Sequence, residues 1–145
     1  MTIAVLICDD SNLARKQLAR ILPQEWQANL FFAGHGAEAL DTLLKHTIHW
    51  LFLDLNMPVM DGIATCTWLN KHYPAMKLIA LSMNDTDNAI IDMVKAGCCA
   101  YLLKDTHPTE LEKALQEVLA KGFYNADASN INFRRLLLKS SEQPM

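Results

Sequence analysis

Five short apolar runs, separated by segments with helical spacing, constrain the fold of this chain more than any other feature of its sequence. The runs are rich in residues that favour strands, and they occupy residues 3–8, 29–33, 50–54, 77–82 and 100–104. Most are continuous rather than alternating, which is typical of strands in a parallel sheet that is covered on both faces. The clearest helical segment begins near Pro108 and ends at Gly122. This alternation predicts an α/β fold with a doubly wound parallel sheet and right-handed crossovers.

Composition narrows the class of protein. A chain of 145 residues suits one domain, and 51% hydrophobic residues are enough for an ordinary core. The formal net charge of -3 gives no reason to expect a surface that binds nucleic acid as a whole. No apolar run approaches the ~20 residues of a membrane span, and the first ten residues lack the basic region of a signal peptide. We therefore expect a cytoplasmic protein without membrane contact, with reduced cysteines and tryptophans that serve packing.

Polar residues stand where the predicted strands end. Asp9 and Asp10 follow the first strand, Asp54 ends the third, Ser82 ends the fourth and Lys104 ends the fifth. Each also has an ordinary interpretation: acids before a helix, a turn residue, a solvated lysine. Because sites of such sheets lie beyond the C-terminal ends of the strands, the coincidence favours one shared pocket.

The chemistry of such a pocket follows from its groups. Carboxylates held close together repel one another, and a divalent cation such as Mg²⁺ removes that cost while leaving positions for phosphate oxygens. A lysine supplies a point charge for a phosphoryl group. Phosphoryl transfer depends mostly on positioning and charge neutralisation, and a carboxylate can itself be the nucleophile and form an aspartyl phosphate.

Residues 3–121 resemble the receiver domain of two-component response regulators. Four motifs carry the resemblance, and they are the acidic pair Asp9-Asp10, "DLNMPVMDG" from Asp54, "ALS" ending at Ser82, and "YLLKD" containing Lys104. The resemblance implies a flavodoxin-like (βα)5 sheet of strand order 2-1-3-4-5.

The resemblance also implies a role for each site residue. Asp54 would be the phosphoacceptor, Lys104 would bridge to the phosphoryl oxygens, and Ser82 and Tyr101 would be the switch residues. Mg²⁺, or Mn²⁺ in its place, would be held by a set of oxygen ligands, namely Asp9, Asp10, Asp54 and the backbone carbonyl of Asn56. The phosphoryl donor would be a sensor histidine kinase. The chain would not be an enzyme for external substrates and would catalyse only its own phosphorylation and dephosphorylation.

One departure points to a subfamily. Many receivers have proline after the site lysine, with a cis peptide bond, whereas this chain has Asp105. The geometry of the Lys104–Asp105 bond is therefore open, since a cis bond without proline costs ~2.5–4 kcal/mol. "YLLKD" is similar to the NarL/FixJ (LuxR-type) subfamily, which usually carries a DNA-binding helix-turn-helix after the receiver.

Residues 123–145 form a second segment of the sequence, in which the alternating pattern weakens. Residues 1–122 would be the receiver, and residues 123–145 a linker or tail with one short helix around 128–139. This segment is too short for a helix-turn-helix, so DNA binding is expected only through an output domain outside this chain. The alternative is a stand-alone receiver that acts by protein contact, and homodimer formation is a further option.

Three rival functions have less support. A silent receiver, used only as a scaffold, is disfavoured because all the acidic and switch positions are filled. Phosphatases that form an aspartyl phosphate typically place a second aspartate two residues after the nucleophile, where this chain has Asn56. A flavodoxin-type module needs a glycine-rich phosphate loop after the first strand, where Asp9 and Asp10 would instead repel an anion.

Overall fold

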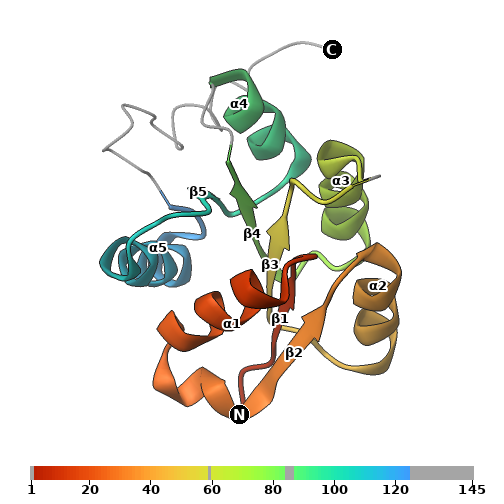
Figure 1. The fold of residues 1–145 in the computed structure, drawn as a ribbon. Coiled ribbons are helices and arrows are strands. Elements are labelled where there is room, and N and C mark those ends of the chain that lie inside the picture. The colour runs from red at the N-terminus through yellow and green to blue at the C-terminus, as the bar shows by residue number, and fades with distance from the viewer. Residues whose placement is uncertain (1, 59, 84–86, 125–145) are drawn as a thin grey trace.

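Five parallel strands form one sheet in the order β2-β1-β3-β4-β5, which confirms the predicted fold class (Figure 1). The structure is a computed structural model that describes residues 2–58, 60–83 and 87–124. The strands are β1 (Val5–Cys8), β2 (Leu30–Ala33), β3 (Trp50–Asp54), β4 (Lys77–Ser82) and β5 (Ala100–Leu103). The α-helices are α1 (Asn12–Ile21), α2 (Gly36–Lys45), α3 (Gly62–His72), α4 (Asp87–Ala96) and α5 (Pro108–Lys121).

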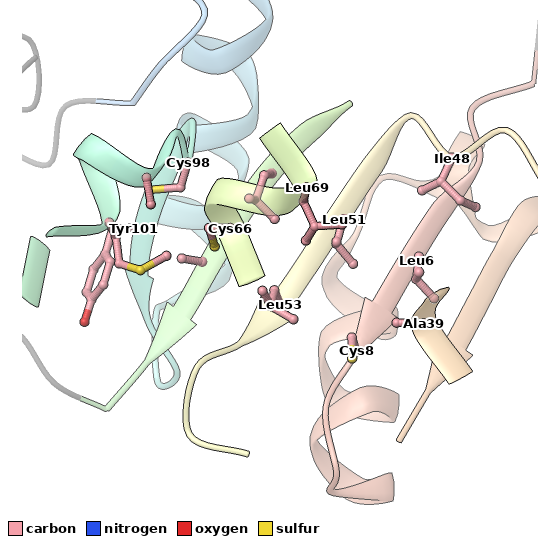
Figure 2. Close-up of a cluster of buried hydrophobic side chains, with 14 of the residues drawn as sticks. Leu6, Cys8, Ala39, Ile48, Leu51, Leu53, Cys66, Leu69, Cys98 and Tyr101 are labelled. Carbon is pink, nitrogen blue, oxygen red and sulfur yellow. The ribbon is translucent and has the colours of Figure 1, made fainter. Parts of the chain in front are cut away.

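The sheet is covered on both faces, as the continuous apolar strands predict. Successive side chains of a strand point to opposite faces, so Leu6 and Cys8 of β1 pack in one core cluster, with residues of α2, α3 and α4. Val5 and Ile7 pack in the other, with residues of α1 and α5. Figure 2 shows part of the first cluster, in which Leu6 and Cys8 point to the same side of the sheet as Ala39 and Leu69.

Local signals in the sequence explain several helix boundaries. The Ser11 hydroxyl accepts a hydrogen bond from the N–H of Ala14 and caps α1, and the Asp61 carboxylate caps α3 in the same way through Ala64. Helix α5 ends at Gly122, whose φ of 89° is left-handed. The caps of α1 and α3 lie in the loops that follow β1 and β3, at the C-terminal edge of the sheet.

The tryptophans divide into two groups. Trp26 and Trp50 pack together with ring centroids 4.9 Å apart, as expected for packing residues. Trp26 lies in η1 (Gln24–Asn29), a 3-10 helix that the apolar spacing did not predict. Trp68 differs, because 42% of its surface is exposed on α3.

Three cysteines are buried and Cys99 is half-buried, and all four are free thiols. None of the helices among the described residues has the length and hydropathy of a membrane span. The helix predicted around 128–139 lies outside the described residues.

Candidate functional site

The predicted site residues meet at the C-terminal edge of the sheet. Asp54 is the last residue of β3 and pairs in register with Leu81 of β4. Asp9 follows β1, and its N–H donates to the carbonyl of Ala33. Lys104 follows β5, and its N–H donates to the carbonyl of Ser82 at 3.0 Å. The parallel register therefore brings the ends of four strands to one place.

Lys104 joins two of the acids. Its Nζ lies 3.1 Å from Oδ2 of Asp9 and 3.2 Å from Oδ2 of Asp54. Both carboxylates are buried, with 3% of Asp9 and 1% of Asp54 exposed. The Lys104–Asp105 peptide bond is trans. Buried charges require a partner of opposite sign, and the ammonium supplies it.

The two oxygens of Asp54 have different environments. Oδ1 accepts a hydrogen bond of 2.8 Å from the backbone N–H of Asn56. Oδ2 is buried without a hydrogen-bond donor, and Nζ of Lys104 lies 3.2 Å away, at ion-pair distance. Burial raises the pKa of Asp54 above its ordinary value, and the neighbouring Asp9 charge adds to this, while the Asn56 N–H and Lys104 oppose it.

Burial has the opposite effect on the pKa of Lys104. Partial burial acts to lower its pKa, but the contacts with Asp9 and Asp54 outweigh that effect and raise the pKa above its ordinary value. The ammonium is therefore protonated at neutral pH. It is a positive charge beside Oδ2 of Asp54.

Three carboxylates gather at the site, and Lys104 pairs with two of them. Asp9, Asp10 and Asp54 can each offer one oxygen such that the three atoms lie within 4.8 Å of one another. Three acids so close together fit a hard divalent cation, which prefers oxygen ligands. The residues present are thus consistent with the divalent metal site predicted from the sequence. The contribution of the Asn56 carbonyl stays a prediction.

Two further contacts shape the loop that follows β1. Oδ1 of Asp9 accepts a hydrogen bond of 2.9 Å from the N–H of Ser11. The guanidinium of Arg15 donates to the carbonyl oxygen of Asp9 at 2.6 Å. Sequence reasoning missed Arg15, although its position one turn into a helix that follows two acids was a usable signal.

The remaining predicted residues line one cleft between α3 and α4. The cleft has a volume of about 350 Å³, and Asn56, Ser82 and Tyr101 are among its lining residues. Ser82 is 3% exposed and Tyr101 is 7% exposed. The amide oxygen of Asn56 accepts a hydrogen bond of 2.9 Å from the N–H of Met83. This contact, which the sequence did not predict, joins the loop after β3 to the loop after β4.

Comparisons with known proteins identify the family of this chain. Residues 5–116 match the model of the response regulator receiver domain. Over 123 residues the chain is 30% identical to the transcriptional regulatory protein DegU of Brevibacillus brevis, covering 84% of this chain and 52% of DegU. It is 31% identical over 121 residues to a chemotaxis protein CheY homolog of Campylobacter jejuni, covering 81% of this chain and 93% of that protein.

A solved structure gives the same result. The RcsB response regulator of Salmonella typhimurium, in a structure described in terms of its conformational dynamism for DNA interaction, superposes with a TM-score of 0.77 at 30% identity. The match covers 96% of this chain and 69% of RcsB. The chain spans about half the length of DegU and most of the CheY homolog. The region that matches the receiver model extends across all five strands and most of α5. This chain therefore belongs to the response regulator receiver family, whose members are phosphoacceptor switches.

Proposed function

We propose that this chain is a phosphorylation-activated switch in which Asp54 accepts a phosphoryl group from a sensor histidine kinase. The observation that carries the proposal is the buried Oδ2 of Asp54, which has no hydrogen-bond donor and lies 3.2 Å from the ammonium of Lys104. An oxygen in that position is a nucleophile with a counter-charge already beside it.

The phosphoryl group passes from a phosphohistidine of the donor to Asp54. Oδ2 of Asp54 attacks phosphorus, a P–O bond forms, and the P–N bond to the donor ring breaks. The electron pair stays on the donor nitrogen, and the ring leaves as neutral imidazole when its other nitrogen carries a proton. Lys104 stabilises the equatorial oxygens as negative charge spreads over them.

The acids around Asp54 would hold the metal ion. Asp9, Asp10, Asp54 and the carbonyl of Asn56 are the proposed ligands of Mg²⁺ or Mn²⁺. When bound, the ion would neutralise both the acids and the phosphoryl oxygens. Asp9 has a second task, because its other oxygen accepts from Ser11 and this contact fixes the carboxylate toward the site.

Ser82 and Tyr101 are proposed to convert the new charge into a change of shape. A phosphoryl group on Asp54 attracts the Ser82 hydroxyl, and movement of the loop after β4 changes the space available to Tyr101. Both residues line the cleft between α3 and α4. The change is a population shift between two packings that the phosphoryl group biases.

The receiver is further proposed to be the regulatory part of a DNA-binding transcriptional regulator of the NarL/FixJ (LuxR-type) subfamily. Support comes from DegU, which is named a transcriptional regulatory protein and is about twice as long as the matched region. The description of RcsB in terms of DNA interaction points the same way. Residues 1–122 would be the receiver and residues 123–145 the linker to an output domain.

A second candidate is a stand-alone receiver that acts by protein contact. The CheY homolog favours it, because the chain matches 93% of that protein. A phosphatase for external substrates has less support, since Asn56 occupies the position of the second acid.

Intact mass after incubation with acetyl phosphate and Mg²⁺ tests the proposal. The wild type should gain the mass of one phosphoryl group, and Asp54→Asn should not. Asp61→Asn is the matched control, because Asp61 caps α3 and is not one of the three gathered acids, and asparagine also caps helices. An equal gain in Asp54→Asn would overturn the assignment of the phosphoacceptor.

A further inference from the structure

A hollow between α2 and α3 is lined almost entirely by apolar side chains and includes none of the acids of the site, nor Lys104. Its volume is about 360 Å³, and its lining residues come from β1, α2, β3, α3 and the loop before α3. Cavities of about 150 Å³ already hold benzene, and ligand pockets begin near 300 Å³. The volume therefore suits a small molecule of about two fused rings.

The hollow lies between two helices that pack against different neighbours. Helix α3 packs against α4, whereas α2 packs against β1 and β2. At the sheet the lining is buried, with Cys8 and Leu53 1% and 3% exposed, whereas Leu40 and Trp68 on the two helices are each 42% exposed. The hollow is therefore reached from solvent at the helices and is floored by the sheet.

The lining carries no charge. Among the described residues that line the hollow, none is acidic or basic, and Thr65 supplies the one hydroxyl. Three other hollows contain charged side chains, namely Asp9, Lys104 and Asp105 between α1 and α5, Glu25 and Glu112 between η1 and α5, and Asp61 and Asp92 between α3 and α4.

Trp68 provides a fixed aromatic wall. Its ring stacks on His72 with centroids 4.2 Å apart and an interplanar angle of 21°. The His72 ring is held in turn by a 2.9 Å contact between its Nδ1 and the carbonyl of Trp68. An exposed indole ring that is held in one orientation offers a flat surface to another ring at little entropic cost.

From this geometry we infer that the hollow between α2 and α3 is a binding site for a neutral, flat, largely apolar molecule of about two fused rings. The site is separate from phosphorylation chemistry, although Cys8 and Leu53 directly precede Asp9 and Asp54 in the chain. The inference goes beyond the proposed switch and does not depend on it.

Indole is a suitable probe because it is neutral, bicyclic and soluble. In proton–nitrogen correlation spectra of the whole chain, indole should cause saturable shifts in amides of α2 and α3, including those of Ala39, Ala64 and Trp68. Benzoate, which is flat but anionic, should shift the same amides far less. Shifts that do not saturate, shifts scattered over the surface, or equal binding of benzoate would overturn the inference.

A pair of matched variants separates the cavity from non-specific binding. Ala64 lines the hollow and Ala120 lies on α5, and both are exposed alanines within helices, so phenylalanine at either position leaves the core unchanged. Ala64→Phe should weaken indole binding by at least about tenfold, equivalent to about 1.4 kcal/mol, and Ala120→Phe should not alter it. Equal binding by Ala64→Phe and wild type would overturn the inference. So would shifts of the same amides with protein concentration alone, which would assign this face to a second copy of the chain.

Discussion

The amide oxygen of Asn56 accepts a hydrogen bond of 2.9 Å from the backbone N–H of Met83. Asn56 lies two residues after Asp54, and Met83 directly follows Ser82. The contact therefore connects the loop that follows the proposed phosphoacceptor to the residue that follows the proposed switch hydroxyl. A shift of the backbone at Met83 away from Asn56 would break or bend this bond.

Removing the acceptor should loosen the loop after β4. Asn56→Ala deletes the amide oxygen, and the loss of one exposed hydrogen bond should lower the free energy of unfolding by about 0.5–1.5 kcal/mol. Hydrogen exchange at the Met83 amide should become faster. Asn56→Asp keeps an oxygen at this position and should retain more of the protection. Unchanged exchange in Asn56→Ala would mean that the hydrogen bond does not restrain the loop.

Divalent metal should stabilise the fold through the three carboxylates. Because the ion binds only the folded arrangement, each tenfold rise of free Mg²⁺ above its dissociation constant should add about 1.4 kcal/mol to the free energy of unfolding. Thermal unfolding with Mg²⁺, Mn²⁺ or EDTA measures this effect. Asp9→Asn should lose most of the stabilisation by Mg²⁺, and the control Asp61→Asn should keep it. If the unfolding midpoint of the wild type did not change with Mg²⁺, a metal site would be excluded.

The ionisation of Asp54 should destabilise the metal-free protein. Burial raises the pKa of Asp54 in the folded protein above the ordinary 3.8. The contribution of this group to the free energy of unfolding is therefore most favourable at low pH, and it is lost as the pH rises through the folded pKa. In EDTA, Asp54→Asn should therefore be more stable than wild type at pH 7, and the difference should close as the pH falls toward 3.8. Chemical denaturation across this range tests the sign. A wild type that gains stability over Asp54→Asn with rising pH would contradict it.

Gly97 should be intolerant of any side chain. Its φ is 105°, and an added Cβ would lie 2.6 Å from Cγ of Asn70. Gly97→Ala should lower the free energy of unfolding by about 1–3 kcal/mol. Gly36 is the matched control, because an added Cβ there meets nothing within 4 Å, and Gly36→Ala at the start of α2 should be neutral or stabilising. Equal effects of the two substitutions would show that the backbone at Gly97 is not restrained.

Much of the fold could be predicted because each local signal has one dominant physical cause. The bounds of β3 and β4 agree with the apolar runs 50–54 and 77–82, and Gly122 ends α5 as predicted. These features depend on burial, β propensity and a left-handed helix cap. Apolar runs, strand-favouring residues and a glycine indicate them in a single sequence. The 3-10 helix around Trp26 was missed because six residues are too few for an apolar period to appear.

The site was predictable in its residues and less so in its contacts. Parallel strands bring their C-terminal ends together, so the acids, Ser82 and Lys104 could be placed in one pocket from order alone. The contacts of Asn56 with Met83 and of Arg15 with the carbonyl of Asp9 depend on loop geometry. A sequence shows which side chains can donate or accept, but the partner is set by how two loops approach each other.

The most direct test of the account is to locate the phosphoryl group. Borohydride reduces an acyl phosphate to an alcohol with loss of phosphate, so the modified aspartate becomes homoserine in the peptide mass spectrum. After reaction with acetyl phosphate and Mg²⁺, homoserine should appear at position 54. No homoserine should appear there when EDTA replaces Mg²⁺. Homoserine at position 9 or 10 instead, or no modified aspartate at all, would contradict it.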